Sequence, residues 1–164
     1  IAHLLGKVEE ADMADYYATG GPYVESMNAG YYLYQPDLSR SAPRDLPRPL
    51  IEVMRYHLKM DGVADFLQAT RKIHDAIQKT DWPAYYDVYL LFNGGEHPTY
   101  VFMFPRKNWA DFEPPEVSFM AMLEKAYGRE EATSVMNLIG KSVHCVHSEI
   151  AASRPDMSYV PETK

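Results

Sequence analysis

The chain has a single cysteine, no cluster of basic residues and no long apolar run. One cysteine, Cys145, cannot form a disulfide within the chain. A net charge of −7 repels the phosphates of nucleic acids, so we do not expect DNA or RNA as a partner. Spanning a bilayer takes about 20 consecutive apolar residues. No stretch of the sequence approaches that length, so we expect a soluble protein without a membrane partner.

Short signatures of catalytic and nucleotide-binding sites are also missing. The sequence has no Gly-x-Ser-x-Gly, no phosphate-binding glycine loop and no dinucleotide fingerprint. Gly94-Gly95 is better explained as part of a hairpin connection than as a phosphate site. The sequence therefore identifies no enzyme class, and it leaves open whether the protein is an enzyme.

The sequence does contain one internal similarity. Gln35-Pro36-Asp37-Leu38-Ser39 returns as Arg154-Pro155-Asp156-Met157-Ser158 at an offset of 119 residues. The apolar pair that precedes the first motif at i, i+3 spacing recurs at the same offset: Val24 and Met27 match Val143 and Val146. This pattern predicts a duplicated unit of 119 residues. The alternative is two unrelated Pro-Asp turns at the ends of strands.

A duplication of this length predicts that the chain begins inside the first copy. Residues 1–47 would be the C-terminal remnant of a first repeat, with helices and a last strand, followed by a proline-rich linker. Residues 48–164 would be a complete second copy. The first residue is Ile rather than Met, so we expect residues upstream that belong to the first repeat or to a removed signal peptide of an exported protein.

From Leu50 onward, hydrophobic periodicity predicts the order β-α-β-β-α-β, with the second helical region in two segments. The predicted elements are strands at 50–60, 85–92, 99–104 and 149–153 and helices at 62–79, 117–127 and 129–147. In the remnant we expect a helix over 1–18 and a strand over 31–34. This order predicts a ferredoxin-like α+β fold, in which an antiparallel four-stranded sheet carries its helices on one face and leaves the other open.

These features resemble a group of mostly uncharacterised bacterial proteins with tandem ferredoxin-like repeats of the dimeric α/β-barrel type. Each repeat in that group ends in a Tyr-Arg-Pro-Asp-Leu-Ser-Tyr-like motif, to which Tyr34–Arg40 and Ser153–Tyr159 are similar. Tyr100–Lys107 is similar to the third strand of those repeats. The resemblance implies two sheets that pair face to face, within one chain or in a homodimer. It carries over no catalytic residues, and related barrels include antibiotic-biosynthesis monooxygenases, haem-degrading enzymes and chlorite dismutases.

The resemblance also places a cavity on the open sheet face. Alternation along the first strand predicts that Arg55 and His57 lie on this face, and Asp87 and Tyr89 share a face of the second strand. These four residues are the candidate ligand-binding site. His57 beside the carboxylate of Asp87 would be a general base, which makes this pair the candidate catalytic residues. Arg55 would hold an anionic group. The alternative is a water-filled polar face or a subunit interface.

The segment His144-Cys145-Val146-His147 holds further potential ligands. The spacing of Val143 and Val146 predicts that this segment ends a helix, with His144 and His147 on the helix surface. Without a second cysteine these residues do not make a closed metal site, so we predict neither a metal nor another cofactor. Haem coordination remains an alternative for three histidines, which are His57, His74 and His144.

Two functions are consistent with the sequence. The first is the binding or conversion of a small organic ligand on the open face, and the resemblance then implies cofactor-independent oxygenation or isomerisation. The second is a structural or interaction module that uses this face for dimerisation, without catalysis. Burying Arg55, His57 and Asp87 unpaired is costly, which favours the first. Because most of the first repeat is missing from this sequence, we predict a homodimer.

Overall fold

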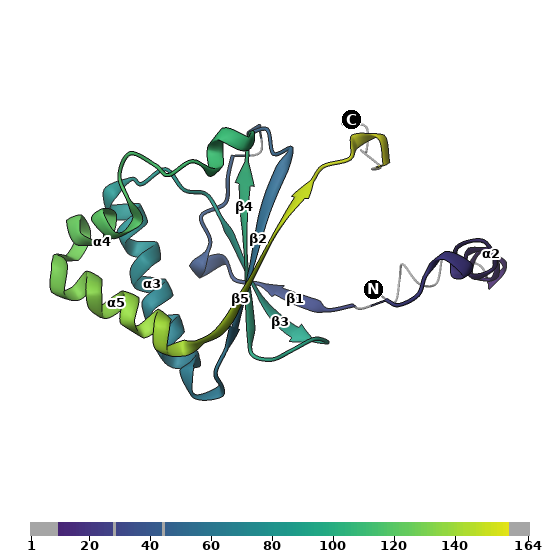
Figure 1. The fold of residues 1–164 in the computed structure, drawn as a ribbon, viewed down its shortest axis with the longest axis horizontal. Coiled ribbons are helices and arrows are strands. Elements are labelled where there is room, and N and C mark those ends of the chain that lie inside the picture. The colour runs from purple at the N-terminus through teal and green to yellow at the C-terminus, as the bar shows by residue number, and fades with distance from the viewer. Residues whose placement is uncertain (1–9, 28, 44, 158–164) are drawn as a thin grey trace.

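The computed structural model describes residues 10–27, 29–43 and 45–157. Within them the chain is α+β, with a five-stranded antiparallel sheet in the order β1-β3-β4-β2-β5. The strands are β1 (Tyr31–Tyr34), β2 (Leu50–Leu58), β3 (Asp87–Asn93), β4 (Thr99–Arg106) and β5 (Val143–Ala152). The helices are α2 (Glu10–Gly20), α3 (Val63–Thr80), α4 (Phe119–Tyr127) and α5 (Arg129–Ser142). Helices α3, α4 and α5 cover one face of the sheet, and the other face is open (Figure 1).

The core lies between the sheet and α3. Helix α3 turns an apolar stripe toward the sheet, and Phe66 on this stripe is 1% exposed. Its ring lies 5.8 Å from that of Tyr56 on β2 and 5.4 Å from that of Tyr100 on β4, centroid to centroid. Asp81 ends the helix in the left-handed conformation, with φ at 49°. The periodicity of β2 and α3 therefore predicted both elements and the faces that they bury.

The sheet has a fifth strand because β1 pairs with the free edge of β3. Leu33 and Tyr34 are the partners of Leu90 and Tyr89. The short 3-10 helix η2 (Pro36–Leu38) follows β1 and places Leu38 in the core, where it is 2% exposed. The strand predicted over 31–34 is thus present, and it joins the sheet formed by the four strands that follow it in sequence.

The end of α5 differs from the prediction. The helix ends at Ser142, and residues 143–147, which were predicted to be helical, belong to β5. Strand β5 pairs with β2 through a bulge: Leu58 is opposite Val143 and Tyr56 is opposite Val146, which leaves one extra residue on β5. The bulge turns Val143 and Val146 to the same side of the sheet. Their i, i+3 spacing, typical of a helix, here marks a bulged strand.

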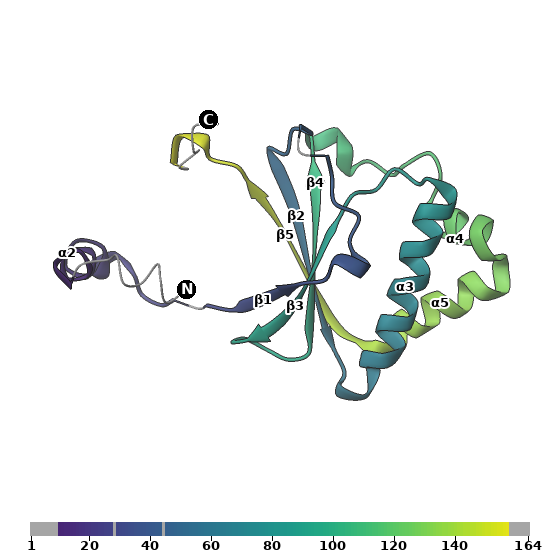
Figure 2. The same cartoon turned by 180° about the vertical axis from the view of Figure 1, so that it is seen from behind.

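Two parts of the chain extend away from the sheet and its helices. Helix α2 lies at the end of an extended segment that leads into β1, and the residues that follow β5 project beyond the sheet (Figures 1 and 2). A 3-10 helix, η5 (Pro155–Met157), follows β5, and Met157 is 75% exposed. The start of the helix predicted over 1–18, and Ser158 and Tyr159 of the second motif, lie outside the described residues. Among the residues that are described, no helix has the length and apolar character needed to cross a membrane.

Candidate functional site

Arg55 and His57 lie on the open face of β2, where alternation along the strand predicted them. The residues that alternate with them, Tyr56 and Leu58, belong to the core on the helix side. Cross-strand partners on β4 place Val101 next to Arg55 and Thr99 next to His57. The two predicted site residues on this strand are therefore neighbours on one face, with the helices on the other.

The guanidinium of Arg55 is held by a carboxylate on the neighbouring strand β5. Its Nη2 lies 2.7 Å from Oε1 of Glu149. This hydrogen bond raises the pKa of Arg55 and lowers the pKa of Glu149. The two side chains are 33% and 57% exposed, so the pair contributes at most about 1 kcal/mol to stability. An anionic ligand of Arg55 would have to compete with this carboxylate.

His57 is fixed by contacts at its Nδ1 atom. Thr99 Oγ1 lies 2.8 Å from Nδ1, and Oε2 of Glu96 lies 3.7 Å from it. The His57 side chain is only 13% exposed. The carboxylate beside His57 is therefore that of Glu96, in the connection between β3 and β4, and not that of Asp87.

Asp87 and Tyr89 lie at the other side of the open face, on β3. Asp87 accepts a hydrogen bond from the hydroxyl of Ser41, which is also within 3.0 Å of the Tyr34 hydroxyl. The rings of Tyr34 and Tyr89 are 5.4 Å apart. Burial raises the pKa of Tyr89, and the negative charge of Asp87 adds to that rise. These residues form a second polar group around the junction of β1 and β3.

The structure does not bring the four predicted residues into one pocket. Strand β4 separates β2 from β3, and along it His57 is opposite Thr99 while Asp87 is opposite Met103. This register puts His57 and Asp87 roughly 15 Å apart. The proposed His57–Asp87 pair is therefore not formed within this chain. Their roles in ligand binding stay a prediction.

The structure gives the histidines near the C-terminus different neighbours from those that the sequence predicted. His144 and His147 are on strand β5 rather than on a helix surface, because the bulge described above replaces the last helical turn. Cys145 is the cross-strand partner of His57, and His147 follows on the same face. The His147 ring lies 5.2 Å from that of His57, centroid to centroid. The sequence predicted both His144 and His147 on a helix surface, whereas the sheet places His147 beside His57.

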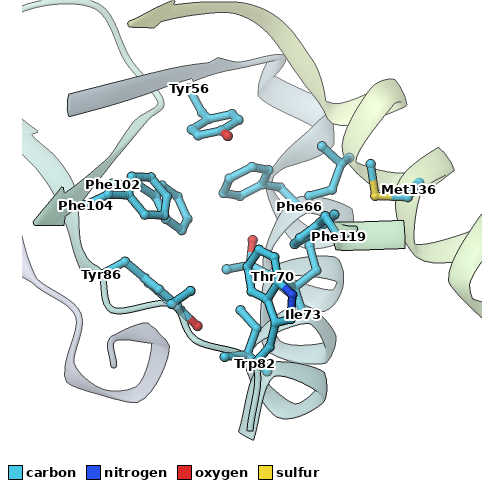
Figure 3. Close-up of a pocket in the computed structure, with 13 residues that line it drawn as sticks. Tyr56, Phe66, Thr70, Ile73, Trp82, Tyr86, Phe102, Phe104, Phe119 and Met136 are labelled. Carbon is cyan, nitrogen blue, oxygen red and sulfur yellow. The ribbon is translucent and has the colours of Figure 1, made fainter. Parts of the chain in front are cut away.

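A pocket of about 310 Å³ lies on the helix side of the sheet, opposite to the face where the sequence predicted a cavity. Figure 3 shows aromatic rings from the sheet facing residues of the helices across this space. The sheet side is formed by Tyr56, Phe102 and Phe104, and the helix side by Phe66, Ile73, Phe119 and Met136. The lining is almost entirely apolar, which fits an uncharged ligand.

A series of hydrogen-bonded side chains, from Gln78 through His74 to Tyr86, reaches the wall of this pocket. Nδ1 of His74 is 2.9 Å from the Tyr86 hydroxyl, and its Nε2 is 2.6 Å from Nε2 of Gln78. Burial raises the pKa of Tyr86 to about 12, and the nearby Arg40 opposes that rise. The side chain of His74 is buried, with 9% exposed. Because both of its ring nitrogens are hydrogen bonded, His74 is not free to coordinate haem.

Comparison with known proteins gives no further guide to this site. No protein-family model matches the chain. No curated protein and no solved structure matches it either.

Proposed function

We propose that residues 48–157 form a ferredoxin-like unit whose function is to pair with a second such unit, as an interaction module of the dimeric α/β-barrel type. The order β3-β4-β2-β5, with three helices on one face, supports the ferredoxin-like assignment. The open face of this sheet is where a second sheet would pack. Pairing would cover Tyr32 and Tyr34, which are 43% and 45% exposed.

The two copies of the Pro-Asp motif have the same local structure, which supports a duplication. The 3-10 helices η2 and η5 begin at Pro36 and Pro155, an offset of 119, and each follows a strand. Two unrelated turns would not be expected to share a 3-10 helix directly after a strand at the offset that the repeated motif gives.

One observation carries the proposal: the first copy of the motif is docked and the second is exposed. In the first, the backbone N–H of Gln35 donates to the carbonyl of Val88, and the N–H of Val88 donates to the hydroxyl of Ser39. Leu38 is then 2% exposed, whereas its counterpart Met157 is 75% exposed. The segment β5–η5 is therefore an arm whose receiving site is the β3 edge of another unit.

The receiving site in this chain is already filled by its own β1–η2 segment. The short tether to β2 gives β1–η2 a high effective concentration, so it outcompetes the arm of another molecule. The homodimer predicted from the sequence stays a prediction. Because β1–η2 already fills the edge of β3, dimerisation through the arms requires a further step. Two copies exchange their β5–η5 arms only after β1–η2 has been displaced.

Replacing Leu38 with aspartate is expected to convert the chain into an arm-exchanged dimer. A carboxylate is costly to bury, so the substitution expels η2 and frees the edge of β3. Met157 of a second copy can then take the place of Leu38. Light scattering at tens of micromolar protein should give twice the mass of the chain, with a melting temperature that rises with concentration.

The double variant Leu38→Asp, Met157→Asp is the matched control, and it should remain monomeric. Met157→Asp alone should leave the mass of the wild-type chain unchanged, because Met157 is 75% exposed. Far-ultraviolet circular dichroism shows whether each variant is folded. A folded Leu38→Asp monomer, or a dimer that persists in the double variant, would contradict the exchange of arms.

A second candidate function, favoured by the apolar pocket, is binding of a small aromatic molecule. Ligand sites commonly have volumes of about 300–1,000 Å³ and mostly apolar walls, and this pocket has about 310 Å³. Its ring-lined walls suit a flat, uncharged ligand that needs few hydrogen bonds. This function is compatible with pairing, because the pocket and the open face are on opposite sides of the sheet.

Indole is a suitable probe of this pocket. At ten times its Kd, a ligand of the folded state stabilises by about 1.4 kcal/mol, which should raise the melting temperature by roughly 2–6 °C. Met136→Trp should abolish the shift, because Met136 lines the pocket and is 38% exposed, so a larger side chain can fill the space. Met60→Trp should preserve the shift, since Met60 is 80% exposed and is not part of the lining. Equal shifts of the melting temperature in both variants would mean that indole binds outside this pocket.

A further inference from the structure

The open face brings together three metal-binding side chains from two strands. His57 on β2 is the cross-strand partner of Cys145 on β5, and His147 follows two residues later on the same face. One ligand atom from each of these residues lies within 4.8 Å of the other two. One of these contacts joins Cys145 Sγ to His147 Nε2, at 3.7 Å. We propose that His57, Cys145 and His147 form a binding site for a Zn²⁺ ion.

The hydrogen bonds of His57 prepare its ring for a metal. The Thr99 hydroxyl has one hydrogen, and it is directed to the backbone carbonyl of Glu96 at 2.5 Å. Toward His57 the same oxygen can therefore only accept, so Nδ1 of His57 must donate at 2.8 Å. This leaves Nε2 of the neutral ring with a lone pair. Metal-binding histidines are oriented in this way by an acceptor at the other ring nitrogen.

The separations are close to those of a zinc site. Zinc bonds are about 2.0–2.1 Å to nitrogen and 2.3 Å to sulfur, so neighbouring ligands in a tetrahedral site are about 3.5 Å apart. The Cys145–His147 contact already has this length. The other separations, which are at most 4.8 Å, have to shorten by no more than about 1.3 Å, which side-chain torsions can supply. His147 is exposed, so an ion can reach the site from solvent.

The charges around the site suit a cation. Arg55 is the nearest basic residue in the cross-strand register, and its charge is compensated by the carboxylate of Glu149 at 2.7 Å. Glu96 adds a second carboxylate beside His57. The thiol of Cys145 would release its proton on binding and supply a negative ligand.

The donor set indicates the kind of ion and the use of the site. Imidazole and thiolate are preferred ligands of zinc, and Mg²⁺ and Ca²⁺ prefer oxygen. Three protein ligands leave a fourth position for water or for a small anion, as in zinc sites that are not closed by the protein. The inference goes beyond the pairing of units, because all three ligands come from one chain.

The test uses the full chain without a polyhistidine tag, treated with chelator and then titrated with Co²⁺ as a spectroscopic substitute for Zn²⁺. One equivalent should produce the absorption of a thiolate-to-cobalt charge transfer together with the visible bands of tetrahedral cobalt. Adding Zn²⁺ should displace the cobalt and remove both. Absence of the charge-transfer absorption, or a stoichiometry far above one, would overturn the site.

Variants separate this site from metal bound elsewhere on the surface. Cys145→Ser should remove the charge-transfer absorption, and His147→Ala should weaken Co²⁺ binding at least 100-fold. Thr99→Val should weaken it about 10- to 100-fold through the orientation of His57, without removing a ligand. His144→Ala is the matched control and should bind as wild type, because His144 is the extra, exposed residue of the bulge. An equal loss in His144→Ala and His147→Ala would contradict the proposal.

Discussion

Replacing Leu38 with alanine is expected to lower the free energy of unfolding by about 2–4 kcal/mol, because it removes a large side chain from the core. Met157→Ala is expected to change it by less than about 0.5 kcal/mol, as is usual for surface positions. The two residues occupy equivalent places in the repeated motif but are 2% and 75% exposed. Urea unfolding followed by the fluorescence of Trp82 and Trp109 measures both variants in one assay.

The comparison is informative because the two positions share their local sequence and their 3-10 conformation. A loss of less than about 1 kcal/mol in Leu38→Ala would mean that η2 is not part of the core of residues 48–157. A loss of 2 kcal/mol or more in Met157→Ala, measured on the monomeric chain, would mean that Met157 is already buried. Either result would remove the asymmetry on which the proposed exchange of arms depends.

Gly62→Ala is expected to destabilise the chain by about 2–3 kcal/mol, because a methyl group at this position meets backbone atoms. A Cβ at Gly62 would lie 2.7 Å from the Cα of Ser142 and 2.8 Å from its carbonyl oxygen. Ser142 ends α5 and also accepts a hydrogen bond from the N–H of Lys59 at 2.9 Å. The substitution therefore pushes apart the start of α3 and the junction of α5 with β5.

Gly140→Ala in α5 is the control for the effect of adding a methyl group. Apart from the neighbouring backbone of its own helix, no atom lies within 4 Å of a Cβ at this position, so alanine should stabilise the helix by about 0.5 kcal/mol. The same urea titration compares the two variants. If Gly62→Ala is as stable as Gly140→Ala, the close approach of α3 to the end of α5 is not a constraint on the fold.

The sequence predicted which face of a strand each residue occupies, but it did not predict which residues of other strands lie beside it. Alternation in β2 assigned Arg55 and His57 to the open face, and in β3 it placed Asp87 and Tyr89 together. It did not show their register against β4, where His57 is opposite Thr99 and Asp87 is opposite Met103. Register depends on long-range pairing, which a local pattern does not contain. For the same reason the proximity of His57 to Cys145 was not visible in the sequence.

Two further features of the structure had no distinct signal in the sequence. The apolar pocket is lined by residues such as Phe66 and Phe102, whose spacing indicated only that they face the core. Whether the side chains of a core fill it or leave a space depends on how the helices are set against the sheet. The predicted helix extended past the end of α5 because the bulge gives Val143 and Val146 the spacing of a helical stripe.

The bulge in β5 also determines which changes the strand tolerates. A strand has two faces, so the bulge determines which face each following residue occupies. Substitutions between Cys145 and Ala152 alter single side chains and leave every residue on its face. Loss of His144, the extra residue of the bulge, would keep Cys145 opposite His57 and Val146 opposite Tyr56. Loss of Val146 would instead place His147 opposite Tyr56, so that His147 and every residue after it would change face. The chemistry of the open face thus depends on the length of the strand as much as on its side chains.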